Sequence, residues 1–278
     1  MLVELHCHTT ASDGAYAPAE LVALAKHHGI SLLAITDHDT IEGCAEAMEA
    51  GQQHRITVIS GIEISALSAH GEVHILGYGI HPQDSATRER IASLRHVRVE
   101  RAKRMLTRLE ALGIHLDFER VRAIAGDGVI GRPHIARAMV EAGFVPSTQA
   151  AFDLYLAEGK PAFAPHVGLT PVQAVELIHA AGGVAVLAHP GLYQSKAEAL
   201  MEELLAVRLD GIEAHYPLHT PEQIAHFSAF AHERGLLITG GSDYHGPLAE
   251  GTALGSVQLP PAELQAFQQR LRVSTNQS

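Results

Sequence analysis

Short apolar runs alternate with longer amphipathic segments at both ends of the chain. The runs have the length and the Val and Ile content of buried strands, and they cover residues 3–8, 31–36, 56–65, 72–79, 184–188, 211–216 and 236–240. The amphipathic segments have helical spacing, and they cover residues 18–28, 41–54, 170–181, 196–207 and 221–234. Strands and helices that alternate over short links are typical of parallel strands, arranged as a (β/α) barrel or as an open sheet.

The middle of the chain has a different pattern. Between residues 88 and 159 the pattern is nearly all helical, and one long helix is indicated by Ile91, Leu94, Val97, Ala102, Met105, Leu109 and Leu112. We therefore predict two parts. Residues 1–99 and 169–278 form the barrel, and residues 100–168 form a small helical insertion between its two halves.

The composition fits a packed globular protein. Apolar residues make up 46% of the chain and charged residues 18%, which argues against disorder. No apolar run approaches the roughly 18 residues of a membrane span, and Glu4, His6 and His8 interrupt any signal-peptide core. The two cysteines, Cys7 and Cys44, offer no disulfide framework. We expect a cytoplasmic protein with no membrane partner.

Charge is distributed unevenly along the chain. The formal net charge of −11 disfavours a long nucleic-acid footprint, because such binding depends on Lys and Arg that neutralise phosphates. Residues 88–137, in contrast, hold twelve of the 20 Lys and Arg and six acids, which gives this window a net charge of +6. A solvated basic helix face is one explanation. A surface that binds an anionic ligand is the other.

Histidine is as abundant as Lys and Arg together, and it gathers with carboxylates near predicted strand ends. His6 and His8 alternate along the first strand, so both face one side while Cys7 faces the core. Further ligand-type residues lie at predicted strand ends, in the loop after the first strand, or within the fourth strand. They are Asp13, His38, Glu63, His74, His189, Asp243 and His245. Because α/β folds build their sites at the carboxyl ends of strands, we expect these groups to converge. So many buried polar groups would be costly without cations.

The chemistry of this set indicates which metals it binds. Imidazole and carboxylate ligands without thiolate suit Mn²⁺, Fe²⁺ or Zn²⁺ and disfavour Ca²⁺ or a structural, Cys-rich zinc site. The set exceeds what one ion needs. We expect two to three divalent ions, with Mn²⁺ as the first choice and Fe²⁺ or Zn²⁺ as alternatives.

Five short motifs resemble, in order, those of the PHP (polymerase and histidinol phosphatase) family: His6-Cys7-His8-Thr9, Thr36-Asp37-His38-Asp39, Gly61-Ile62-Glu63, His189-Pro190 and Ser242-Asp243-Tyr244-His245. The resemblance spans the chain apart from the insertion. It implies an α/β fold, a distorted (β/α)7 TIM-like barrel, with a trinuclear metal centre. The ligands it implies are His6, His8, Asp13, His38, Glu63, His74, His189, Asp243 and His245. Glu63 would bridge ions, and Asp37 would orient a ligand imidazole.

The resemblance also implies an enzyme, a metal-dependent phosphoric monoester hydrolase. The insertion and the segment Gly131-Arg132-Pro133-His134-Ile135-Ala136 resemble the branch that acts on 3′,5′-nucleoside bisphosphates and short oligonucleotides. We expect a small nucleotide such as 3′-phosphoadenosine 5′-phosphate to lose its 3′-phosphate to a hydroxide that bridges two ions. The residues expected to act in catalysis are Asp13, His38, Glu63 and His189.

We expect the basic insertion to cap the site and to hold a second, non-reacting phosphate. Arg101, Arg104 and Arg108 fall on one helix face, and guanidinium groups form forked contacts with phosphate. The candidate substrate-binding residues are Arg101, Arg104, Arg132, His134 and His215. The arginines could instead cover the barrel mouth or pair with local acids.

Three other functions are compatible with the pattern. A histidinol-phosphate phosphatase would use the same cluster, but its small substrate gives no use to a basic insertion. A 5′-3′ exonuclease on short oligonucleotides could coexist with the phosphatase, although no Trp, six Tyr and seven Phe make an extended stacking platform unexpected. A non-catalytic metal-binding or interaction module is disfavoured by the intact ligand motifs. The sequence specifies no oligomeric state.

Overall fold

A computed structural model describes residues 1–69, 71–81, 85–247 and 253–275. Seven strands form one sheet in which sequence neighbours are also spatial neighbours, in the order β1 to β7. The strands are β1 (Leu2–Glu4), β2 (Ile30–Ile35), β3 (Thr57–Ser68), β4 (Gly71–Tyr78), β5 (Val184–Leu187), β6 (Gly211–His215) and β7 (Leu237–Gly240). All seven runs predicted as strands are strands in the structure.

One strand runs against the others. β1–β2, β2–β3, β5–β6 and β6–β7 are parallel pairs, but β4 is antiparallel to both β3 and β5. The expectation of parallel strands throughout was therefore wrong at β4. Only two positions separate Ser68 from Gly71, whereas a parallel crossover needs a dozen or more residues. The reversal pairs His74 with Ser65, so His74 lies inside a strand rather than at a strand end.

Among the described residues β1 and β7 form no strand pair, and a few contacts join the two edges of the sheet instead, so the barrel is a distorted one. An isolated parallel bridge joins Cys7 to Tyr244, where His8 N–H donates to Tyr244 O at 2.9 Å. Below it, the buried Glu4 carboxylate accepts hydrogen bonds from Ser242 N–H and Oγ–H and from Gly255 N–H, at 2.8, 2.6 and 2.9 Å. One carboxylate thus ties the first strand to the segment that follows β7.

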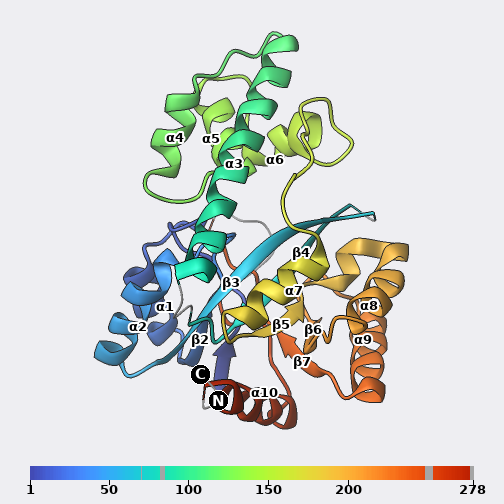
Figure 1. The fold of residues 1–278 in the computed structure, drawn as a ribbon. Coiled ribbons are helices and arrows are strands. Elements are labelled where there is room, and N and C mark those ends of the chain that lie inside the picture. The colour runs from blue at the N-terminus through green and yellow to red at the C-terminus, as the bar shows by residue number, and fades with distance from the viewer. Residues whose placement is uncertain (70, 82–84, 248–252, 276–278) are drawn as a thin grey trace.

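Helices cover the outside of the sheet, with α1 and α2 on one side and α8 and α9 on the other (Figure 1). The covering helices are α1 (Pro18–His27), α2 (Glu42–His54), α7 (Pro171–Ala180), α8 (Ala197–Leu205), α9 (Pro221–Arg234) and α10 (Pro261–Thr275). No element was predicted at α10, although Leu264, Phe267 and Leu271 have helical spacing. Phe267 packs edge-to-face on Tyr78. Within the described residues, no helix has the length and apolar character to cross a membrane.

The helical region, residues 85–164, stands above the barrel (Figure 1). Its elements are α3 (Ser85–Ala111), α4 (Phe118–Ala125), α5 (Arg132–Glu141), α6 (Thr148–Ala151) and a π-helical turn (Phe152–Leu156). A hydrophobic cluster of its own extends from Ala102 to Ala164. α3 contributes to both cores, because Ile91 and Leu94 pack in the barrel while Met105 and Leu109 pack in the helical region.

Candidate metal centre

The nine candidate ligands lie together at the barrel mouth. Their ligand atoms form overlapping groups within 4.8 Å: His8, Asp13, His38 and His245; His6, His8, Glu63 and Asp243; His38, Glu63 and His74. The ninth residue, His189, joins them through Nε2, which lies 3.2 Å from Glu63 Oε1 and 3.3 Å from His74 Nδ1. Three overlapping groups could hold more than one divalent cation.

Glu63 is the residue on which these groups converge. It is fully buried on β3. Its Oε1 lies 2.8 Å from His74 Nδ1 and 3.4 Å from His6 Nε2, and its Oε2 lies 2.8 Å from His38 Nδ1 and 3.4 Å from His8 Nε2. Burial opposes ionisation, but the imidazoles of His74, His38 and His6 outweigh it and hold the pKa of Glu63 well below its usual range. Each oxygen of Glu63 therefore faces its own set of imidazoles. A carboxylate in this position could bridge two cations.

A buried carboxylate orders the loop after β1. Asp37 accepts hydrogen bonds from Thr9 N–H, Thr9 Oγ1–H and Ser12 Oγ–H, each at 2.7 Å. The turn over residues 9–14 places these donors around Asp37 and holds Asp13 over the mouth. We expected Asp37 to orient a ligand imidazole. Because the donors of this turn surround its oxygens, Asp37 positions the loop instead.

Glu213, which was not among the predicted site residues, does orient a ligand imidazole. It is fully buried on β6, and it accepts hydrogen bonds from His6 Nδ1 at 3.0 Å and from His189 N–H at 2.9 Å. The first bond turns His6 Nε2 towards Glu63 and Asp243. A carboxylate inside the apolar run Gly211-Ile212-Glu213 was the signal that could have identified it.

His215, two residues further along, lies outside the ligand groups. The register of β6 against β7 is irregular between Glu213 and His215, so the usual alternation of side chains is interrupted there. His215 is half-buried, and burial lowers its pKa while Glu263 of α10 opposes that shift. His215 was proposed as a substrate-binding residue from its position at a strand end, and that position does not reveal the irregular register.

Two of the candidate ligands occupy strained backbone. His189 and Asp243 have φ values of 28° and 54°, in the left-handed region that costs a non-glycine residue of order 1 kcal/mol or more. Neighbouring contacts hold both residues there. Glu213 accepts the backbone N–H of His189, and Tyr216 donates a hydrogen bond to Asp243 Oδ2 at 3.1 Å. Strain of this kind gathers at functional sites.

Unsatisfied polar atoms show that the cluster fits metal ions. Among the described residues, nine buried side-chain nitrogen and oxygen atoms make no hydrogen bond. Five of them belong to candidate ligands: His6 Nε2, His8 Nδ1, Asp13 Oδ1, His38 Nδ1 and Glu63 Oε2. His38 Nδ1 lies close to Glu63 Oε2 but is not aligned for a hydrogen bond. Because buried polar atoms are normally paired, this concentration of lone pairs indicates a site for divalent cations.

The pKa values of two candidate ligands, His8 and His245, shift in opposite directions, and each shift suits a metal site. Burial, together with His245 and His38, lowers the pKa of His8 to about 3, which leaves its ring neutral, the form that binds metal. At His245 burial acts in the same direction, but Asp13 and Asp243 outweigh it and raise the pKa to about 10. The carboxylates draw protons onto such rings, and divalent cations would replace those protons.

Three of the arginines of α3, Arg101, Arg104 and Arg108, share a helix face, as their spacing indicates, and that face packs along residues 163–165. Each guanidinium donates to a backbone carbonyl there: Arg101 to Ala164, Arg104 to Pro165 and Arg108 to Phe163. Arg101 is buried and also forms a two-pronged ion pair with Glu72, at 3.1 and 2.6 Å. These contacts attach α3 to the segment that returns to the barrel.

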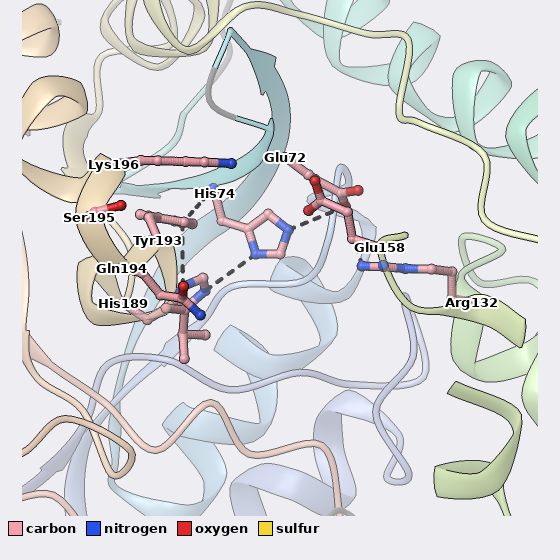
Figure 2. A pocket seen from close by; sticks show the side chains of 10 residues that line it. Glu72, His74, Arg132, Glu158, His189, Tyr193, Gln194, Ser195 and Lys196 are labelled. Atoms are coloured by element: carbon pink, nitrogen blue, oxygen red, sulfur yellow. Dashed lines mark hydrogen bonds and ion pairs between the residues drawn. The ribbon is translucent and has the colours of Figure 1, made fainter. Parts of the chain in front are cut away.

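Arg132 and His134 begin α5 but lie in different surroundings. His134 is buried, and its Nδ1 accepts a hydrogen bond from Gly131 N–H at 2.9 Å, which caps the start of the helix. Arg132 lines a pocket of about 410 Å³ beside the metal centre (Figure 2). His74 and His189 lie in the middle of this pocket, between Arg132 on one side and Lys196 on the other (Figure 2).

Sequence comparisons identify relatives over nearly the whole chain. A 3′,5′-nucleoside bisphosphate phosphatase from Chromobacterium violaceum is 37% identical and covers 93% of each chain. A 5′-3′ exoribonuclease from Haemophilus influenzae is 37% identical over 88% of this chain and 90% of its own. The 5′-3′ exoribonuclease Rnm from Escherichia coli is 35% identical over 89% of this chain and 86% of its own.

Solved structures and a family model agree with these relatives. A chain from Bifidobacterium adolescentis assigned as a metal-dependent phosphoesterase superimposes with a TM-score of 0.88, at 31% identity, covering 96% of this chain and 95% of that one. An amidohydrolase from Chromobacterium violaceum, with bound sulfate and no metal, has the same TM-score at 34% identity, covering 99% and 97%. The model of the PHP domain matches residues 4–126. The chain belongs to the PHP domain family and is a metal-dependent hydrolase of phosphate esters.

Proposed function

We propose that this protein removes the 3′-phosphate from nucleoside 3′,5′-bisphosphates, such as 3′-phosphoadenosine 5′-phosphate, to give a nucleoside 5′-monophosphate and phosphate. The observation that carries the proposal is the pocket of about 410 Å³ that opens beside His74 and His189. It has the size of a small-molecule site, and it joins the metal centre to two basic residues, Arg132 and Lys196. The bisphosphate phosphatase from Chromobacterium violaceum supports the same substrate.

In the proposed binding mode, the two phosphates of the substrate lie at opposite ends of this pocket. The nine candidate ligands would hold two to three divalent ions at the reacting phosphate, with Mn²⁺ proposed and Fe²⁺ or Zn²⁺ as alternatives. When bound, such ions activate water and offset charge on the phosphoryl group. Arg132, from the helical region, would contact the second phosphate through its planar guanidinium. The helical region then acts as a cap that selects the substrate.

Kinetics with two substrates test this assignment. With Mn²⁺ present, we expect Arg132→Gln to raise the KM for the bisphosphate about tenfold or more, because it removes a charge-assisted hydrogen bond. The same variant should keep its kinetics on a simple aryl phosphate, which has no second phosphate. Arg120→Gln is the matched control, since Arg120 is exposed on α4 and pairs with Glu141. If Arg132→Gln impaired the kinetics equally on both substrates, Arg132 would not be the residue that contacts the second phosphate.

The exoribonuclease relatives support a second candidate function, 5′-3′ hydrolysis of short oligonucleotides. The same pocket would then receive a terminal nucleotide. A comparison of kcat/KM for the bisphosphate and for a short 5′-phosphorylated oligonucleotide ranks the two functions. We expect the bisphosphate to be preferred. A preference for the oligonucleotide would replace the phosphatase by the nuclease as the principal activity.

A further inference from the structure

Tyr193 occupies a position between two candidate ligands that neither the sequence motifs nor the proposed mechanism explains. It lies in the 3-10 helical segment Pro190–Lys196 and lines the pocket beside the metal centre (Figure 2). Its hydroxyl oxygen accepts a hydrogen bond from His74 N–H at 2.9 Å. The same oxygen lies 3.4 Å from His189 Nδ1. One phenol therefore contacts the two imidazole-bearing residues that border the pocket.

The tautomer of His189 decides which way the hydroxyl hydrogen points. His189 Nε2 faces Glu63 Oε1 and His74 Nδ1, at 3.2 and 3.3 Å, so Nε2 is the nitrogen available to a cation. A neutral imidazole carries one proton, and a ring that offers Nε2 as a ligand keeps that proton on Nδ1. His189 Nδ1–H then donates to Tyr193. Both lone pairs of the Tyr193 oxygen are used by N–H donors, and its own hydrogen is left for another acceptor.

We propose that Tyr193 is a substrate-contacting residue, whose hydroxyl donates a hydrogen bond to an oxygen of the phosphoryl group held at the metal centre. Tyr193 lines the pocket beside His74 and His189, and its hydroxyl contacts both residues, at the edge where that group must lie to reach the ligand cluster. The proposal rests on phosphate-ester hydrolysis and not on the choice of a bisphosphate. It therefore predicts the same effect on every phosphate ester.

Tyr216 provides a matched comparison for this hydroxyl. It is also a tyrosine that contacts the centre, but its hydrogen is already donated to Asp243 Oδ2. Tyr216→Phe should weaken metal binding because it releases Asp243, and excess Mn²⁺ should restore its activity. Tyr193→Phe should bind metal but lose a contact with the substrate. The two substitutions remove the same atom, so their difference reports what each hydroxyl does.

The experiment measures turnover, metal content and phosphate binding together. For Tyr193→Phe at saturating Mn²⁺ we expect kcat to fall about 10- to 100-fold on both the bisphosphate and an aryl phosphate. Calorimetry should show weaker binding of inorganic phosphate to the metal-loaded variant, with metal content equal to that of the original protein. A loss that excess Mn²⁺ repairs, or unchanged phosphate binding, would reduce Tyr193 to a residue that only orients His189 and would overturn the proposal.

A second measurement needs no variant. Nitrogen-15 spectra of the Zn²⁺-loaded protein report which ring nitrogen of His189 carries the proton. We expect the proton on Nδ1, within reach of Tyr193. A proton on Nε2 would mean that Tyr193 donates to His189 Nδ1 and has no hydrogen left for the substrate. The proposal would then fail independently of the substrate that the enzyme prefers.

Discussion

The barrel mouth and the helical region both concentrate charged side chains, but they differ in how those charges are satisfied. At the mouth, imidazole and carboxylate groups point at one another and leave five buried atoms without hydrogen bonds. In the helical region, Arg101, Arg104 and Arg108 of α3 donate to three consecutive backbone carbonyls. A cluster with unused lone pairs is prepared for a ligand, whereas a cluster whose guanidinium groups donate to backbone carbonyls supports the structure. Charge alone does not separate these two cases.

Glu72 connects the two regions. It is held by Arg101 at 2.6 Å and approached by Arg132 at 3.4 Å, and it lies 3.7 Å from His74 Nε2. The imidazole of His74 in turn contacts Glu63 at 2.8 Å. The carboxylate of Glu72 thus joins the helical region to the metal centre, and this contact can be removed by a single substitution.

The largest effect is expected at the barrel mouth itself. Glu63→Gln removes the charge on which the imidazoles converge, so we expect bound metal to be lost and kcat/KM to fall by about 10³-fold or more. Elemental analysis of the purified variant and turnover with Mn²⁺ measure both quantities. Circular dichroism checks that the fold is kept. Full metal content in this variant would show that the charge of Glu63 is not needed to hold the ions.

A large effect on stability is expected where the two regions meet. Glu72→Gln leaves the buried Arg101 guanidinium without its counter-charge, and breaking a buried ion pair from one side costs about 3–5 kcal/mol. Urea denaturation measures the free energy of unfolding. Glu100→Gln is the matched control, because Glu100 pairs with Lys103 at the exposed surface and its loss should leave the unfolding curve unchanged. Equal curves for both variants would show that Glu72 is not a structural link.

The smallest effect is expected at an exposed arginine of the helical region. Arg104 donates to Pro165 O from an exposed position on α3, so Arg104→Ala should change KM for the bisphosphate by less than about twofold. Steady-state kinetics beside Arg132→Gln provide the comparison. A tenfold rise in KM would place the second phosphate on α3. Arg104 would then bind substrate rather than support the structure.

The ligand cluster could be anticipated from sequence because strand geometry dictates it. His6 and His8 had to share a face, since side chains alternate along a strand. His38 and Asp243, which follow β2 and β7, had to converge, since parallel strands finish at one rim. Glu63 was expected at a strand end as well, but β3 continues past it to Ser68. Periodicity and topology thus predicted the direction in which each side chain points. For short side chains, that direction was sufficient to predict that they form a cluster.

The remaining parts depend on contacts that periodicity does not encode. The spacing of Arg101 and Arg104 predicted a shared helix face, but not that residues 163–165 would cover it. The irregular register before His215 is local, and no periodic pattern in the sequence predicts it. Glu213 was overlooked because one acid in an apolar strand gives no periodic signal, although its burial demanded a partner such as His6.

The hydrogen bonds that Glu4 accepts from Ser242 and Gly255 also bear on the order in which the fold assembles. β3 and β4 form a hairpin from adjacent segments, so Glu63 and His74 can meet early, on the microsecond timescale of hairpin formation. Glu4 meets Ser242 across 238 positions and Gly255 across 251, and such distant contacts carry the entropy of closing a very long loop. His6, beside Glu4, and Asp243, beside Ser242, are brought together by that late encounter. We therefore expect the contacts that complete the cation site to form late in folding, with metal bound after them.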